Sequence, residues 1–342
     1  MDQSLESNVP DEFEALAKIQ EKATDDLMDR ANVVGVGLGL KSTGGEETDQ
    51  RCITVFVSAK LDSDLLDRQD RVPKKISDVP TDVVEIGELM AGDAWSPGST
   101  AVLDDAPPET STTGIQRLSA RVRPVLGGFS VGHPRVTAGT IATGCYDLRT
   151  MPGIPARYYI LSNNHVLANS NDASVGDPIL QPGVADGGRY PADVIGQLSR
   201  WIPIRFHEGG EHPCNYVDAA VAEVPFHQVD RRVYWVGTIK SLYSAPKPGD
   251  IVQKTGRTTN FTTGRVQSVN ATVDVNYGRG RTARFCRQIL TTNMSAGGDS
   301  GSVVTDRSER GVGLLFAGSS RVTVMNHLNY VQALLGVRIS ES

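Results

Sequence analysis

This chain of 342 residues has few cysteines and aromatic residues, no long apolar run, and no excess of positive charge. Its 4 cysteines include no CxxC pair and fall below the density of a disulfide-stapled scaffold. No apolar run reaches the ~18 residues needed to cross a bilayer, and the polar, acidic first residues differ from a secretory signal. The net charge of −6 argues against nucleic acid as the main partner. We therefore expect a cytoplasmic protein with no membrane partner.

Glycine is frequent, with 35 residues, and it separates many short apolar runs. This pattern favours β-strands joined by tight turns, as in a sandwich or in barrels. Strands are expected at residues 136–142, 158–161, 219–224, 251–254, 264–269, 271–275, 288–291, 302–304 and 313–318. Residues 328–335 predict a short terminal helix that ends at Gly336.

The first 90 residues predict a small α+β unit. Residues 11–30 carry apolar side chains at helical spacing, and strands are expected at 34–40, 52–58 and 82–86. The glycines at 35, 37 and 39 indicate a strand backed closely by another element. They do not form a dinucleotide-binding loop, because Leu40 stands where the third glycine of GxGxxG belongs. Nothing in this unit has the look of a catalytic cluster, so we expect it to support the fold or to contact protein.

Three later segments supply the parts of an acyl-transfer site in the order His, Asp, Ser. Such a site needs an alcohol nucleophile, an adjacent base, a group that orients the base, and donors facing the oxyanion. His165 follows a buried apolar run, Asp218 precedes a run of small apolar residues, and Ser300 lies in a GGDSG segment. The flanking glycines permit a tight turn in which the N–H groups of Gly298 and Ser300 form an oxyanion hole. This order excludes the subtilisin and α/β-hydrolase arrangements.

The three segments resemble the signature segments of trypsin-like serine peptidases, over about residues 115–335. Segments 34–40, 176–183 and 314–320 are similar to a bacterial branch related to the plant Narrow Leaf proteins. The resemblance implies a mainly β, two-barrel trypsin-like peptidase fold with a small α+β N-terminal domain. The predicted divisions are an N-terminal domain at 1–95, a Ser- and Pro-rich linker at 96–114, a first barrel at 115–233, and a second barrel with the terminal helix at 234–342.

The same resemblance implies a serine endopeptidase in which His165, Asp218 and Ser300 are catalytic, with no metal or organic cofactor. Its partner would be a protein or peptide substrate, and a homo-oligomer is left open. The strand Phe316-Ala317-Gly318 matches the one that pairs with substrate backbone. Met294 matches the floor of the pocket for the residue before the cut, which implies a preference for apolar or small side chains.

The chain departs from the family pattern in three ways. Ser302 replaces a glycine after the nucleophile, and no cysteine follows His165 to form the usual loop disulfide. More than 100 residues precede the peptidase domain, so a freed N-terminal amine cannot pair with Asp299 unless the chain is cut. How the turn around Ser300 is held therefore stays open at the level of sequence.

Other functions are weaker hypotheses. The alternative from a different class is a protein-binding scaffold on a peptidase fold with an idle triad. Residues 207–214 contain two histidines and a cysteine, but no fourth zinc ligand at a usual spacing, and we interpret them as a surface loop. The arginines at 279, 281, 284 and 287 suggest RNA binding, yet a polar hairpin face is favoured. Residues 254–259 lack the phosphate-loop pattern.

Overall fold

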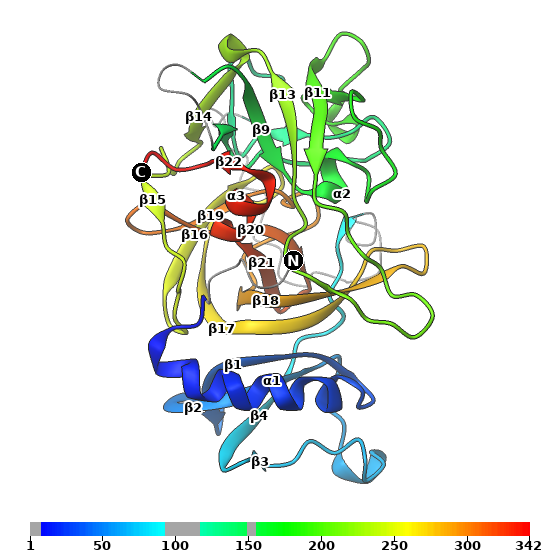
Figure 1. The fold of residues 1–342 in the computed structure, drawn as a ribbon, viewed down its shortest axis with the longest axis vertical. Coiled ribbons are helices and arrows are strands. Elements are labelled where there is room, and N and C mark those ends of the chain that lie inside the picture. Colours follow the sequence, from blue (N-terminus) through cyan, green and yellow to red (C-terminus); the bar gives the residue numbers. More distant parts are fainter. Residues whose placement is uncertain (1–7, 93–116, 149–154) are drawn as a thin grey trace.

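The computed structural model describes residues 8–92, 117–148 and 155–342. The predicted linker at 96–114 lies outside these residues. Figure 1 shows the small N-terminal unit at one end, the strands β16–β21 in the middle, and β9, β11 and β13 at the other end. The chain is mainly β, as the sequence predicts. Among the described residues, no helix is long and apolar enough to cross a membrane.

The N-terminal unit is a helix packed on a small sheet, as predicted. A 3₁₀ turn (Asp11–Phe13) leads into α1 (Glu14–Met28), whose apolar face buries Leu27. Strands β1 (Val33–Thr43) and β2 (Glu46–Val57) form an antiparallel hairpin, and β4 (Val79–Glu85) pairs parallel to β2. The short β3 (Lys75–Ile76) pairs with β4 at the edge of the sheet.

This unit shares its sheet with the second barrel, which the sequence does not reveal. Strand β1 pairs antiparallel with β17 (Asn260–Asn276), so one sheet of 12 strands runs through both parts. The close backing predicted for the alternating glycines is confirmed: a Cβ added at Gly37 would lie 2.3 Å from Ser268 Oγ. Glycine at this position therefore lets the backbones of β1 and β17 pair closely side by side within the sheet.

The peptidase part contains two sheets, and one core cluster packs Tyr159 and Val221 of the first against Leu314 of the second. A 6-stranded sheet in the order β10-β11-β13-β9-β8-β22 belongs to the first barrel, and the strands β16–β21 belong to the 12-stranded sheet. The strands between residues 125 and 233 are, in chain order, β5 (Val125–Gly127), β6 (Ser130–Val131), β7 (Gly139–Thr140), β8 (Gly144–Asp147), β9 (Tyr158–Ser162), β10 (Pro178–Leu180), β11 (Val194–Trp201), β12 (Cys214–Asn215), β13 (Ala220–Val224) and β14 (Val229–Val233). The strands after residue 240 are β15 (Ser241–Leu242), β16 (Ile251–Gly256), β18 (Thr282–Thr292), β19 (Val303–Asp306), β20 (Arg310–Gly318), β21 (Val322–His327) and β22 (Val337–Arg338), the last of which joins the 6-stranded sheet.

Several predicted elements differ in extent from the observed ones. The strands expected at 264–269 and 271–275 are one strand, β17, in which Asn270 has a φ of 51° at a register shift. The strand expected at 136–142 shrinks to β7. The terminal helix is confirmed: α3 spans Leu328–Leu335, and Gly336 ends it with a φ of 66°. Strand β22 then returns to pair with β8 of the first barrel, which ties the end of the chain across both barrels.

Candidate active site

The first barrel brings His165 and Asp218 together. His165 lies on the single turn α2 (Asn164–Leu167), directly after β9, while Asp218 stands two residues before β13. Strands β9 and β13 pair with Ser162 opposite Ala220, so the chain ends that carry the two residues are neighbours. Asn163 fixes this junction because its side-chain amide donates to the Asp218 carbonyl at 2.7 Å.

The imidazole and the carboxylate form a short, buried pair. His165 Nδ1 lies 2.6 Å from Asp218 Oδ2, and the His165 backbone N–H donates to Oδ1 at 3.2 Å. The two residues are 3% and 0% exposed. Because a carboxylate only accepts, Nδ1 carries the proton and Nε2 keeps a free lone pair. His165 Nε2 is buried and has no hydrogen-bond partner among the residues described, which is the state required of a general base.

Two further groups hold Asp218, and the sequence pointed to neither. Tyr277 lies at the end of the β17–β18 hairpin, and its hydroxyl donates to Asp218 Oδ2 at 2.7 Å. The Tyr277 ring meets the His165 ring edge-on, with 5.9 Å between the two ring centroids. Burial, together with the nearby carboxylate, raises the pKa of Tyr277 well above its usual value, so the phenol stays a donor. Asn326 on β21 accepts the Asp218 backbone N–H at 2.9 Å. Tyr277 stood beside the arginine cluster in the sequence, and no spacing rule links it to Asp218.

Ser300 lies in the predicted tight turn, against the first barrel. The Thr140 N–H of β7 donates to the Ser300 carbonyl at 2.7 Å, and Gly298 and Gly301 have φ values of 98° and 96°. The structure places the serine 4% exposed, without a hydrogen bond to His165. Such bonds are often long in the absence of substrate. Within the described ranges neither the Gly298 N–H nor the Ser300 N–H donates a hydrogen bond, so both are available to an oxyanion.

A buried lysine holds the turn at Asp299, which answers the question left by the sequence. Lys254 Nζ on β16 lies 3.0 Å from Asp299 Oδ2, and both side chains are 0% exposed. The carboxylate also accepts from the backbone N–H groups of Thr258, Thr259 and Ala296 at 2.9, 3.1 and 3.1 Å. Burial lowers the pKa of Lys254, and Asp299 opposes that shift. The cation that a cut N-terminus would supply is therefore already present within the fold.

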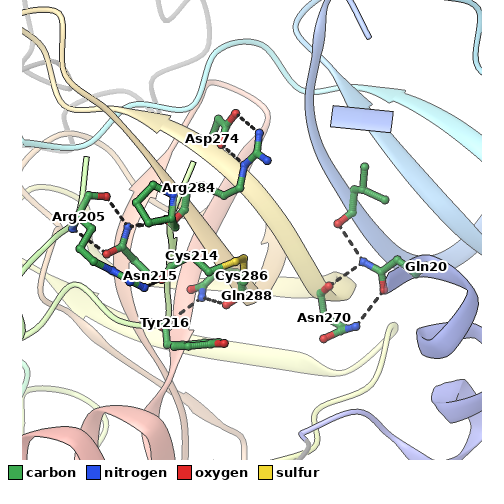
Figure 2. The surroundings of a disulfide bond; sticks show 12 residues. Gln20, Arg205, Cys214, Asn215, Tyr216, Asn270, Asp274, Arg284, Cys286 and Gln288 are labelled. Atoms are coloured by element: carbon green, nitrogen blue, oxygen red, sulfur yellow. Dashed lines mark hydrogen bonds and ion pairs between the residues drawn. A yellow bond between two sulfur atoms is a disulfide. The ribbon is translucent and has the colours of Figure 1, made fainter. Parts of the chain in front are cut away.

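A disulfide links β12, four residues before Asp218, to its parallel neighbour β18 in the 12-stranded sheet. Cys214 on β12 and Cys286 on β18 are bonded, with their Cα atoms 5.6 Å apart, and they are separated by 72 residues in the sequence. Figure 2 shows the Asn215 side chain beside this bond, accepting from the Arg205 N–H at 2.8 Å and donating to the Arg284 carbonyl at 3.0 Å. The sequence missed this pair, since nothing local marks two cysteines that meet only through folding.

The residues expected to bind substrate are either buried or already hydrogen-bonded within the protein. Met294 is 4% exposed and belongs to the core, with its Sδ 2.6 Å from where a Cβ on Gly264 would stand. Phe316 and Ala317 are 0% exposed. Gly318 already exchanges two backbone hydrogen bonds with Met90 of the N-terminal unit, at 2.9 and 3.1 Å. The N-terminal unit, in which the sequence showed no catalytic cluster, therefore reaches the strand edge that was expected to bind substrate.

The other candidate sites have local roles. The described residues contain no group of three or more side chains that could hold a metal ion, and the Cys214 thiol is used in the disulfide. Arg284 is buried and makes two hydrogen bonds to Asp274 across the β17–β18 hairpin. Arg281 lies over the Phe206 ring. These contacts agree with the interpretation of the arginines as a polar hairpin face.

Comparisons with known proteins agree with this geometry. Residues 142–314 match the model of the trypsin-like peptidase domain, and residues 16–85 match that of the NARROW LEAF 1 N-terminal domain. The chain is 31% identical over 149 residues to glutamyl endopeptidase 2 of Streptomyces griseus, a match that covers 43% of this chain and 64% of that protein.

Two solved structures are similar. Thermobifida fusca protease A shares 16% identity at a TM-score of 0.44, covering 64% of this chain and 99% of that one. Cellulomonas bogoriensis chymotrypsin shares 16% identity at a TM-score of 0.41, with the same two coverages. The family model of the trypsin-like peptidase domain matches residues 142–314, which is about half of the chain and includes His165, Asp218 and Ser300. The chain therefore belongs to the trypsin-like peptidase family.

Proposed function

We propose that this protein is a serine endopeptidase that hydrolyses peptide bonds through His165, Asp218 and Ser300. The observation that carries the proposal is the buried His165–Asp218 pair at 2.6 Å, which leaves Nε2 without a hydrogen-bond partner among the described residues. A scaffold with an idle site has no chemical need for a base kept dry and oriented in this way. Asp218 keeps one tautomer of the imidazole and stabilises the imidazolium that forms during the reaction.

The reaction proceeds in two stages. Ser300 Oγ attacks the peptide carbonyl carbon while its proton passes to His165 Nε2, and the N–H groups of Gly298 and Ser300 stabilise the oxyanion. The tetrahedral intermediate collapses as the C–N bond breaks, and the leaving amine takes the proton from His165. Water then attacks the acyl-enzyme, gives a proton to Nε2, and releases the acid with Ser300 restored. No metal or organic cofactor takes part in these steps.

The proposal is tested by labelling with a fluorophosphonate and by peptide hydrolysis. The intact protein is expected to add one label, and Ser300→Ala should lose both the label and activity, by up to about 10⁶-fold in rate. Ser308→Ala, at an exposed serine, is the matched control and should keep both. A folded protein that takes no label, or a Ser300→Ala variant that cleaves as fast as the wild type, would support the idle scaffold.

We further propose that apolar or small side chains are preferred immediately before the cut. Met294 is an apolar residue of the core, and the hydroxyls of the adjacent Ser295 and of Thr323 bond to each other at 2.6 Å. The name of the Streptomyces griseus relative suggests glutamate instead. Matched peptides with Ala, Leu, Glu or Arg before the cut decide between the two. Faster cleavage after Glu than after Ala or Leu would contradict the apolar preference.

The location and assembly of the protein stay predictions. A cytoplasmic location rests on the sequence alone, and a disulfide such as Cys214–Cys286 is more typical of oxidising compartments. Fractionation of the native host, with thiols trapped before lysis, would test the location and the bond together. The mass of the protein in solution would test for a homo-oligomer.

A further inference from the structure

The chain that leaves the N-terminal unit lies along the strand edge at which a peptide substrate is expected to pair. In Figure 1 the cyan segment after β4 runs from the small unit to the peptidase part. Met90 N–H donates to the Gly318 carbonyl at 2.9 Å, and Gly318 N–H donates back to the Met90 carbonyl at 3.1 Å. This is an antiparallel pair, so Met90 takes up both backbone groups that Gly318 would offer to another strand.

The segment is held on its other side as well. Asn276 N–H at the end of β17 donates to the Leu89 carbonyl at 2.9 Å, and Ala91 N–H donates to the Asn276 carbonyl at 3.0 Å. Leu89 and Ala91 are 1% and 0% exposed, in the same core cluster as Phe316. Four backbone hydrogen bonds and two buried side chains make this segment a fixed part of the fold rather than a loose tail.

The segment at residues 89–92 leads from Gly318 toward the catalytic histidine. From Met90 the chain continues through Ala91 to Gly92, where an added Cβ would stand 3.8 Å from His165 Cδ2. Among the described residues, no backbone hydrogen bond joins Ala91 or Gly92 to Phe316 or Ala317, so the segment occupies the strand edge at Gly318 and leaves the backbone groups nearer the cut open. An external peptide cannot occupy the same hydrogen-bonding groups at the same time.

We propose that residues 89–92 determine specificity by closing the substrate edge beyond the two residues that precede the cut. This inference rests on the proposed peptidase function. The chain's own backbone occupies the position at which a third residue of the substrate would pair with Gly318. The enzyme therefore recognises a peptide by the residues next to the cut and by those after it, and gains nothing from a longer extension on the amino side.

The test is a series of fluorogenic amides with one, two, three and four residues before the cut and the same leaving group. Two backbone hydrogen bonds to Gly318 would raise kcat/KM by about tenfold or more. For the wild type we expect a change of less than about threefold when the third residue is added. A gain of tenfold or more would overturn the inference.

Met90→Pro sharpens the test, because proline lacks the N–H that donates to Gly318. In this variant the edge should become available, so the third residue should raise kcat/KM by about tenfold. Met90→Leu keeps the N–H and is the matched control, with the length dependence of the wild type. A Met90→Pro protein that folds but stays indifferent to the third residue would contradict the inference.

Hydrogen exchange supplies a second measurement on the unaltered segment, in case Met90→Pro does not fold. In the Ser300→Ala protein, the N–H groups of Met90 and Ala91 should stay protected when a saturating four-residue peptide is bound. Faster exchange there would mean that substrate displaces the segment, which overturns the inference. A fluorophosphonate labels Ser300 without needing substrate residues before the cut. An enzyme that takes the label but whose kcat/KM rises strongly with peptide length would therefore refute this inference and leave the proposed peptidase function standing.

Discussion

Replacing Lys254 by methionine tests whether the buried pair with Asp299 holds the oxyanion turn. The side chains have similar lengths, so Lys254→Met removes the charge and the 3.0 Å contact while largely filling the space. Asp299 is then a carboxylate that is 0% exposed and lacks a cation. Its remaining donors are backbone N–H groups and the Thr259 hydroxyl, which lies 2.6 Å away.

The expected loss of stability follows from the burial of the pair. Removing one partner of a buried ion pair costs about 3–5 kcal/mol, and the surviving hydrogen bonds to Asp299 place this case near 3 kcal/mol. The activity should fall further, because Asp299 stands between Gly298 and Ser300, whose N–H groups we propose form the oxyanion hole. If the turn shifts and one donor is lost, the rate should fall by about 10²–10³.

Urea unfolding and steady-state hydrolysis of a short peptide measure the two effects separately. Lys240→Met is the matched control, because the Lys240 side chain is 67% exposed in its pair with Glu309 and should change stability by less than about 1 kcal/mol. In the double variant Lys254→Met/Asp299→Asn, part of the lost stability should return, since no unpaired charge stays buried. The reasoning is refuted if Lys254→Met loses less than 1 kcal/mol and keeps its kcat within threefold.

Three further predictions concern the supports of the site. Tyr277→Phe should lower kcat/KM for a short peptide by roughly tenfold, because the Asp218 carboxylate loses a hydrogen-bond donor; Tyr243→Phe, at another Tyr–Asp hydrogen bond, should leave kcat/KM unchanged. Burial lowers the pKa of His327 from 6.5 to about 3, so the unfolded chain binds more protons in this range, and the contribution of this histidine should lower the stability by about 2 kcal/mol between pH 6.5 and 4.5. Urea unfolding at both pH values should show a smaller loss in His327→Gln, and equal losses would contradict the assignment. Replacing Cys214 and Cys286 by serine should cost about 4 kcal/mol by the loop-entropy estimate, and a Tm equal to that of the oxidised wild type would contradict a structural role for the bond.

Local signals in the sequence predicted the elements and the order of the triad. The alternating glycines near Gly37 predicted close backing of a strand, and Gly336 predicted the end of the terminal helix. These features depend on the chemistry of neighbouring residues, such as the missing Cβ of glycine and the period of apolar side chains. The prediction of His165, Asp218 and Ser300 depended instead on their order along the chain and on the family resemblance, because the histidine and aspartate segments are weak signals in isolation.

Tertiary structure alone decided what surrounds the triad. Lys254 meets Asp299, Tyr277 meets Asp218, and Met90 meets Gly318 only after strands far apart in the sequence have paired. No periodicity or motif encodes these contacts, since their energies depend on burial and on the register of several strands at once. The sequence by itself thus determined the order of His165, Asp218 and Ser300, on which the proposed acyl-transfer site depends. The fold decided how the oxyanion turn is held and which part of the substrate edge stays open, because both depend on groups that burial brings together.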